Sequence, residues 1–197
     1  MIFKSNQYKF ISVVIPKCGS SSQKRFWKKY PHTRKGSNWA KRMRKKEDGF
    51  FRFVIVRSPW SRLYSAFFDK TKVCKGTRFQ LPYYRKYNKS NFTEFLNGEY
   101  KRFKSGKEFD GHHRQISDLF EEDWPDFIGK LENINDDWAI ILSRLGIEDA
   151  QFPFQNQRGD HYFHSRNSMV GFYKPDQIKM VEEMYEEDIR RFNYRFE

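Results

Sequence analysis

An apolar stretch that runs directly into a turn of small residues is the feature that most constrains the fold. Residues 10–15, Phe-Ile-Ser-Val-Val-Ile, are mostly β-branched or aromatic, which favours a buried strand. Pro16 cannot donate a hydrogen bond to a sheet, so the strand is expected to end there. Gly19 and the serines after it lead into a helix predicted over residues 23–30, with its N-terminus at the turn. The turn is therefore expected to bind an anion such as a phosphate group, and Lys17 adds a positive charge to it.

The turn reads Pro-Lys-Cys-Gly-Ser-Ser-Ser over residues 16–22, with the lysine before the glycine. The triphosphate-binding loop of nucleotide-binding enzymes has its lysine after the glycine, in a G-x-x-x-x-G-K-[ST] pattern that this chain lacks. The turn instead resembles the 5′-phosphosulfate loop of sulfotransferases, Pro-Lys-x-Gly-Ser/Thr-Thr/Ser-Ser. The resemblance implies that the whole loop binds the molecule that donates the sulfuryl group: Pro16, Lys17, Cys18, Gly19, Ser20, Ser21 and Ser22.

A second strand-and-helix segment carries two more candidate anion ligands. Residues 50–56 are nearly all apolar toward their end, as expected for a central parallel strand covered on both faces. Arg57 comes directly after this strand, and Pro59 stands at a favourable first position for a helix. Ser65 then lies about two turns into that helix, so Arg57 and Ser65 could reach the same anion.

The same segment, residues 57–70, matches the pattern Arg-x-Pro-x-x-Arg-Leu-x-Ser-Ala-x-x-Asp-Lys. This pattern resembles the 3′-phosphate-binding segment of sulfotransferases. The resemblance implies 3′-phosphoadenosine 5′-phosphosulfate (PAPS) as sulfuryl donor and adenosine 3′,5′-bisphosphate (PAP) as product, with Lys17 at the phosphosulfate and Arg57 and Ser65 on the 3′-phosphate. Lysine, arginine and backbone amides can neutralise the charge of the leaving group without a metal ion, so no metal is expected.

The second half of the chain extends the resemblance. Residues 124–132, Trp-Pro-Asp-Phe-Ile-Gly-Lys-Leu-Glu, are predicted to form a third strand, and an amphipathic helix capped by Asn135 is predicted to end at Gly146. These blocks and the C-terminal helix predicted over residues 175–192 resemble the carbohydrate sulfotransferase branch called family 2. The resemblance implies an α/β fold, a P-loop-like three-layer domain with a central parallel sheet flanked by helices. A chain of 197 residues is too short for two ordinary domains, so residues 1–197 are expected to form a single domain.

An alcohol acceptor needs a base to take its proton, and a histidine that titrates near neutral pH suits this role. His112 and His113 are the leading candidates; a tryptophan is expected at the second position in many relatives, which leaves the alignment of the pair open. His32 is the second choice, because it lies between the two donor motifs, where some polysaccharide sulfotransferases have their catalytic histidine. An aspartate or glutamate base stays an alternative. His161 and His164 have a metal-compatible spacing but no predicted carboxylate or thiol partner, which argues against a metal site.

Positive charge is concentrated in two blocks of the sequence. The formal net charge is +13, and residues 24–46 contain eleven Lys or Arg and residues 70–89 seven, with no acid in either block. These blocks flank the donor motifs and predict a basic cleft with an anionic partner. We expect the acceptor to be a hydroxyl of an acidic or sulfated saccharide, with Tyr83, Tyr84 and Tyr87 stacking on sugar faces. Two other classes stay open, a non-catalytic nucleic-acid-binding module and a nucleotide kinase-like P-loop protein.

Two long segments show little regular pattern and are interpreted as walls of the binding site. Residues 71–111 are aromatic and basic, with one short helix predicted over residues 91–96 and capped by Ser90 or Asn91. This segment is expected to contact the acceptor. Residues 151–170 form a polar loop that could close over the nucleotide.

The cysteine content and the hydropathy of the sequence indicate the cellular compartment in which the protein is expected. Cys18 and Cys74 are too few for a disulfide framework, which favours a reducing compartment or a protein indifferent to redox conditions. No apolar run reaches the length of a signal peptide or a membrane span, so we expect no membrane span and a cytoplasmic location. Nucleic acid is not the expected partner, because that role leaves the strand-end positions of Lys17 and Arg57 unexplained.

Overall fold

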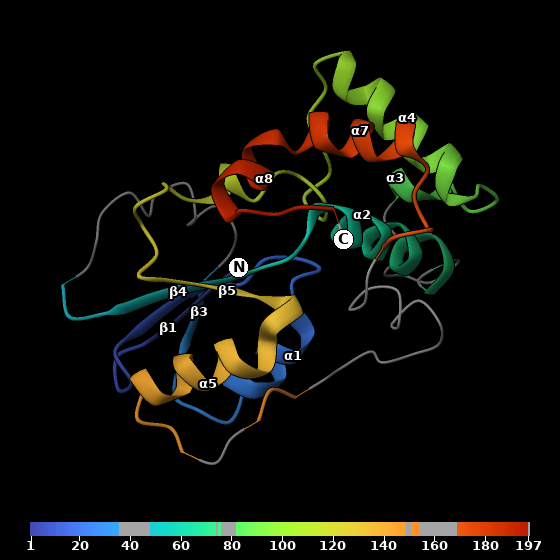
Figure 1. Ribbon diagram of the computed structural model, residues 1–197. Helices are drawn as coiled ribbons and strands as arrows, with labels where there is room; N and C mark the ends of the chain where they lie inside the picture. The colour runs from blue at the N-terminus through green and yellow to red at the C-terminus, as the bar shows by residue number, and fades with distance from the viewer. Residues whose placement is uncertain (36–47, 74, 76–81, 149–150, 154–168, 197) are drawn as a thin grey trace. The chain divides into compact units, whose positions relative to one another are not determined.

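The structure is a computed structural model that describes most of the chain (Figure 1), namely residues 1–35, 48–73, 75, 82–148, 151–153 and 169–196. Contacts between backbone segments divide it into two compact units. The first unit comprises Met1–Arg57 with Ile116–Gln157, and the second comprises Ser58–Gln115 with Arg158–Glu197. The interpretation of residues 1–197 as a single domain stays a prediction.

The first unit is built on a five-stranded mixed sheet in the order β3-β1-β2-β4-β5. Its strands are β1 (Ile2–Ser5), β2 (Phe10–Val13), β3 (Thr33–Lys35), β4 (Phe51–Val56) and β5 (Phe127–Lys130). The three predicted strands are β2, β4 and β5, and they pair in parallel. The expected α/β class is confirmed. The sheet is mixed because β1 and β3, which were not predicted, add antiparallel pairs beside β2.

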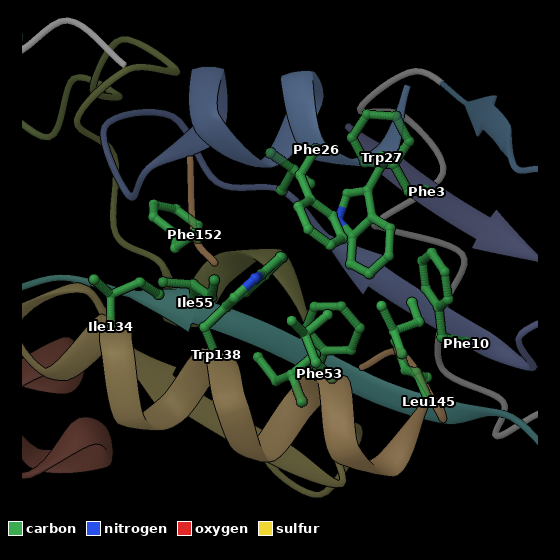
Figure 2. Close-up of a cluster of buried hydrophobic side chains, with 14 residues drawn as sticks. Phe3, Phe10, Phe26, Trp27, Phe53, Ile55, Ile134, Trp138, Leu145 and Phe152 are labelled. Atoms are coloured by element: carbon green, nitrogen blue, oxygen red, sulfur yellow. The ribbon is translucent and has the colours of Figure 1, made fainter. Parts of the chain in front are cut away.

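Two helices pack against this sheet through an aromatic cluster (Figure 2). They are α1 (Ser20–Trp27) and α5 (Ile134–Arg144). The ring centroids of Trp27 and Trp138 lie 5.5 Å apart across the two helices, and Trp27 lies 4.4 Å from Phe10 of β2. Burying side chains of this size stabilises the fold by about 2–3 kcal/mol each. The cluster therefore fixes α1 firmly on the sheet, and with it the turn that precedes α1. The described residues of this unit also include two short 3-10 helices, η3 (Ser117–Leu119) and η4 (Leu131–Asn133).

The described part of the second unit consists of helices joined by loops. They are α2 (Pro59–Phe68), the π-helix η2 (Asp69–Val73), α3 (Pro82–Arg85), α4 (Phe92–Lys104), α7 (Pro175–Met184) and α8 (Glu186–Phe192). As predicted, α2 begins at Pro59 and Asn91 caps α4. The Asn91 side chain accepts a 2.9 Å hydrogen bond from the backbone N–H of Glu94, whose carboxylate accepts one from the N–H of Asn91. No helix in the described ranges is long and apolar enough to cross a membrane.

Several helix boundaries differ from the predictions. α1 begins three residues earlier than predicted, directly after Gly19 in its left-handed conformation. α4 runs well past the predicted residues 91–96, because a buried face continues as far as Glu99. The N-cap position of α5 is Asn133 instead of Asn135, and its side chain makes no capping hydrogen bond. The helix predicted over residues 175–192 is interrupted at Tyr185, whose backbone leaves the helical region (φ −129°, ψ 27°) and whose buried hydroxyl donates to the carbonyl of His113 at 2.6 Å.

Candidate active site

The turn between β2 and α1 is held by its own backbone. The Cys18 N–H donates to the Ile15 carbonyl at 3.3 Å, and the Gln23 N–H donates to the Gly19 carbonyl at 2.9 Å. The buried side chain of Gln23 donates a further bond to the Cys18 carbonyl at 3.0 Å. Lys17 has a left-handed backbone (φ +69°), which costs a residue other than glycine about 1–2 kcal/mol. Such a conformation in a residue with a side chain indicates that the surrounding contacts determine the shape of the turn.

Gly19 is required at its position for two reasons. Its φ of +70° lies in the left-handed region, which glycine adopts without steric cost. A Cβ atom there would also lie 2.9 Å from Cζ of Phe152 and 3.0 Å from Cδ1 of Leu131. A side chain at residue 19 would therefore force either the turn or the side chains of Phe152 and Leu131 to shift.

The start of α1 has the chemistry of an anion site. Its first backbone amides have no partner within the helix, its first turn contains no acidic residue, and Gly19 offers no side chain to cap it. Of the predicted loop residues, Cys18 and Ser22 are buried, Pro16, Lys17 and Ser20 are half-buried, and Ser21 is exposed. Backbone amides and the side chains of Lys17, Ser20 and Ser21 are therefore the groups suited to bind a ligand.

Arg57 meets this turn at the carboxyl edge of the sheet. β4 is the parallel neighbour of β2, so both strands end at the same edge. The guanidinium Nη1 of Arg57 donates to the carbonyl oxygen of Lys17 at 2.9 Å, and Arg57 is only 4% exposed. The structure thus brings together two of the predicted donor-binding residues. Ser65 lies half-buried in the second turn of α2, in the other unit, and its role stays a prediction.

His32 lies at the end of the sheet where β2 begins, whereas the turn lies at the other end, where β2 finishes. Through their shared partner Lys4 on β1, Thr33 aligns with Ile11, so His32 lies level with the beginning of β2. At about 3.3 Å per residue, this is roughly 20 Å from the turn that follows β2. The His32 ring packs against Phe3, and its Nδ1 lies 2.8 Å from the carbonyl oxygen of Tyr30. The structure does not bring His32 to the candidate anion site.

His113 is completely buried in the second unit. Its Nε2 lies 2.9 Å from Oε2 of Glu99, which is also completely buried, and its Nδ1 lies 3.0 Å from the hydroxyl of Tyr84. The Tyr87 hydroxyl donates to the other oxygen of Glu99 at 2.8 Å. Tyr84 and Tyr87 are 0% and 7% exposed, so the prediction that they stack on sugar faces is wrong. Their rings are core, and their hydroxyls satisfy the buried polar groups. For Tyr83 only the position in α3 is described.

His112 is the partly exposed member of the histidine pair, with 29% of its side chain accessible. Its backbone N–H and its ring Nδ1 lie 2.9 Å and 2.7 Å from the same oxygen, Oδ1 of Asp110. The Asp110 carbonyl accepts from the N–H groups of His113 and Arg114, so one short turn presents both histidines. Burial would raise the pKa of Asp110, but hydrogen bonds from His112 and Tyr84 hold it well below its ordinary value. Asp110 is therefore a carboxylate at neutral pH.

Neither Glu99 nor Asp110 was predicted from the sequence, and neither was the polar role of Tyr84. The one local signal is an aspartate two residues before a histidine, a spacing at which the carboxylate can accept from the histidine backbone. Among the described residues, no cluster of His, Cys, Asp or Glu could hold a metal ion. His161, His164 and most of the loop predicted over residues 151–170 lie outside the described ranges.

Comparison with known proteins gives one match. A profile of the sulfotransferase family matches residues 1–195, nearly the whole chain. No curated protein and no solved structure matches at a significant level. The matched family corresponds to the carbohydrate sulfotransferase branch called family 2, which confirms the resemblance seen in the sequence motifs. The turn that resembles a phosphosulfate-binding loop lies at the carboxyl edge of the parallel β2–β4 pair, and the family profile covers nearly the whole chain: the chain belongs to the sulfotransferase family.

Proposed function

We propose that the protein transfers a sulfuryl group from PAPS to a hydroxyl group of a carbohydrate. Family membership supports sulfuryl transfer in general. The choice of donor rests on the hydrogen bond from Arg57 to the Lys17 carbonyl. This bond joins the segment that resembles a 5′-phosphosulfate loop to the start of the segment that resembles a 3′-phosphate site. PAPS carries both anionic groups, so it matches both segments.

The residues of the turn fit a phosphosulfate group by their chemistry. The amides at the start of α1 and the Ser20 and Ser21 hydroxyls can donate hydrogen bonds to its oxygens, while Lys17 contributes a full charge. When bound, PAPS supplies a sulfuryl group attached to a phosphate leaving group. Lys17 would neutralise the negative charge that develops on that leaving group, and Arg57 would hold the 3′-phosphate with Ser65.

Calorimetry with three ligands tests the donor assignment. PAP should bind clearly more tightly than ATP, because the chain has cations for a 3′-phosphate but lacks the triphosphate loop pattern. A random single-stranded oligonucleotide should bind weakly and lose its affinity steeply as salt is added. Tight oligonucleotide binding without a response to PAP would favour the nucleic-acid module, and preference for ATP would favour the kinase-like alternative.

A saccharide with acidic or sulfated groups is the proposed acceptor. The support is the net charge of +13 and the two acid-free basic blocks, residues 24–46 and 70–89. Residues 36–46 of the first block and residues 74 and 76–81 of the second lie outside the described ranges, so this part of the proposal rests on the sequence. The rings of Tyr84 and Tyr87 are buried and not available for stacking on sugars, so the proposal gives charge the main part in acceptor affinity.

The acceptor's Michaelis constant is therefore expected to be strongly salt-dependent. Raising ionic strength from about 0.01 M to 0.15 M shortens the Debye length from roughly 30 Å to 8 Å, which screens exposed cations from an anionic acceptor. The KM for an acidic saccharide should rise severalfold, while the KM for the donor, bound partly by the buried Arg57, should change less. Steady-state kinetics on matched neutral and sulfated saccharides measures both. A neutral alcohol or phenol that is used best, and independently of salt, would contradict a charged carbohydrate acceptor.

His112 is the proposed base that takes the proton of the acceptor hydroxyl. Its ring is partly exposed, its Nδ1 is occupied by Asp110, and its Nε2 makes no hydrogen bond within the described residues. His113 is enclosed by protein groups on both ring nitrogens, and His32 lies at the far edge of the sheet. His112 is thus the histidine of the three best suited to meet a substrate.

A further inference from the structure

A chain of hydrogen bonds in the second unit links the buried Glu99 to the partly exposed His112. Glu99 contacts His113, His113 contacts the Tyr84 hydroxyl, that hydroxyl donates to Asp110 at 3.0 Å, and Asp110 contacts His112. We propose that this set of five residues, the Glu99–His112 network, fixes His112 with a proton on Nδ1 and leaves Nε2 as the proton acceptor. The inference rests on the proposed function and assigns positioning roles within it.

The direction of the hydrogen bonds follows from counting protons. Tyr84 has one hydroxyl proton, and both Asp110 and Nδ1 of His113 lie within hydrogen-bonding distance of its oxygen. The Asp110 carboxylate can only accept, so the Tyr84 proton belongs to that contact. The Tyr84 oxygen must then accept from His113, which requires a proton on Nδ1 of His113. On its other side, His113 shares a proton with Glu99 across the 2.9 Å contact. The Glu99–His113 pair therefore keeps its proton inside the core and acts as a donor to Tyr84.

His112 gains a defined role in the reaction from this arrangement. Asp110 can accept only from a protonated Nδ1, so the neutral His112 ring carries its lone pair on Nε2. As the acceptor oxygen bonds to sulfur, the bond from sulfur to the bridging oxygen breaks and its electron pair leaves with the 5′-phosphate of PAP. The hydroxyl proton passes to Nε2, and the resulting imidazolium keeps its Nδ1–H on the Asp110 carboxylate. Asp110 and Tyr84 are positioning residues, and His113 holds Tyr84 in place by donating a hydrogen bond to its hydroxyl oxygen.

NMR of the histidine ring nitrogens tests the network without any substrate. In the wild-type protein with the His112 ring neutral, its Nδ1 should give a pyrrole-type 15N signal and its Nε2 a pyridine-type signal. At the same pH, Nδ1 of His113 should be of the protonated type. The opposite tautomer at His112, or an unprotonated Nδ1 at His113, would overturn the proposal.

Two matched tyrosine variants separate positioning from stability. Tyr84→Phe removes the hydroxyl that joins His113 to Asp110, and it should lower kcat about 10- to 100-fold, the usual effect of losing an orienting partner. The donor KM should stay unchanged, and the His112 tautomers should become mixed. Tyr173→Phe is the control, because its equally buried hydroxyl donates to the Trp60 carbonyl at 2.9 Å, outside the network. It should lose similar thermal stability while kcat and the His112 signals stay as in the wild type.

Asp110→Asn provides a second variant that keeps the turn. The amide oxygen can still accept from the His112 backbone N–H, but its charge is lost. A fall in kcat with a changed pH profile supports positioning, whereas equal kcat in the wild type, Tyr84→Phe and Asp110→Asn would overturn it. If the wild type transfers no sulfuryl group at all, the proposed function fails, while the ring-nitrogen signals still decide whether the network holds His112 as described.

Discussion

Replacing Lys17 with alanine is expected to lower kcat by about 10²–10³-fold, because preorganised charges act most strongly where negative charge develops in the transition state. Binding of the product PAP should weaken far less, since the α1 amides and Arg57 remain. The left-handed backbone of Lys17 is stabilised by the contacts of the turn, so the alanine variant should fold. Single-turnover kinetics with PAPS, together with calorimetry of PAP, measures the two effects separately.

Lys179→Ala is the matched control for this experiment. It removes the same charge from the exposed surface of α7, and its kcat should equal that of the wild type. Near-normal turnover in Lys17→Ala would show that Lys17 is only a structural cation. A parallel loss of turnover and PAP affinity would indicate that Lys17 binds the donor without favouring the transition state.

Removing the Arg57 side chain is expected to weaken PAP binding by about 2–4 kcal/mol, or roughly 30- to 1,000-fold, the range for truncating one partner of a buried charged contact. An analogue without the 3′-phosphate, such as adenosine 5′-phosphosulfate, should lose much less of its affinity for the variant. Its loss should not be zero, because Arg57 also donates to the Lys17 carbonyl and thereby supports the 5′ loop at about 1 kcal/mol. Calorimetry of both ligands on Arg57→Ala gives the difference.

Ser65→Ala provides the comparison within the same proposed site. Ser65 lies in α2, so this variant leaves the 5′ loop itself intact. It should weaken PAP binding by about 1 kcal/mol while leaving binding of the analogue unchanged. Equal losses for PAP and the analogue in both variants would contradict a 3′-phosphate role for Arg57 and Ser65.

The donor loop could be predicted because its signals are local in the sequence. A β-branched run, Pro16 and Gly19 determine a strand, its end and a left-handed turn within a dozen residues, and Pro59 marks the start of α2 in the same way. β1 and β3 could not be predicted, because a strand of three or four residues at a sheet edge carries too little pattern. Their pairing is decided by the partner strand and by the turn between them.

The two adjacent histidines show where local reasoning ends. His112 and His113 have nearly the same sequence surroundings, yet one is partly exposed and the other is buried between Glu99 and Tyr84. Those partners lie 14 and 29 residues away, on α4 and α3. Only tertiary packing brings them to His113. The same packing explains why aromatic residues predicted to face sugars are part of the core.

The contacts of Gly19 also determine when during synthesis the donor loop can take its final shape. Phe152 and Leu131, which pack against Gly19, occur more than a hundred residues later in the chain. A nascent chain that ends after β4 contains every residue of the 16–22 turn but lacks the surface on which that turn rests. Contacts of such long sequence separation form late and slow the search for the native state. The turn is therefore expected to take its final shape only once the chain as far as Phe152 has left the ribosome.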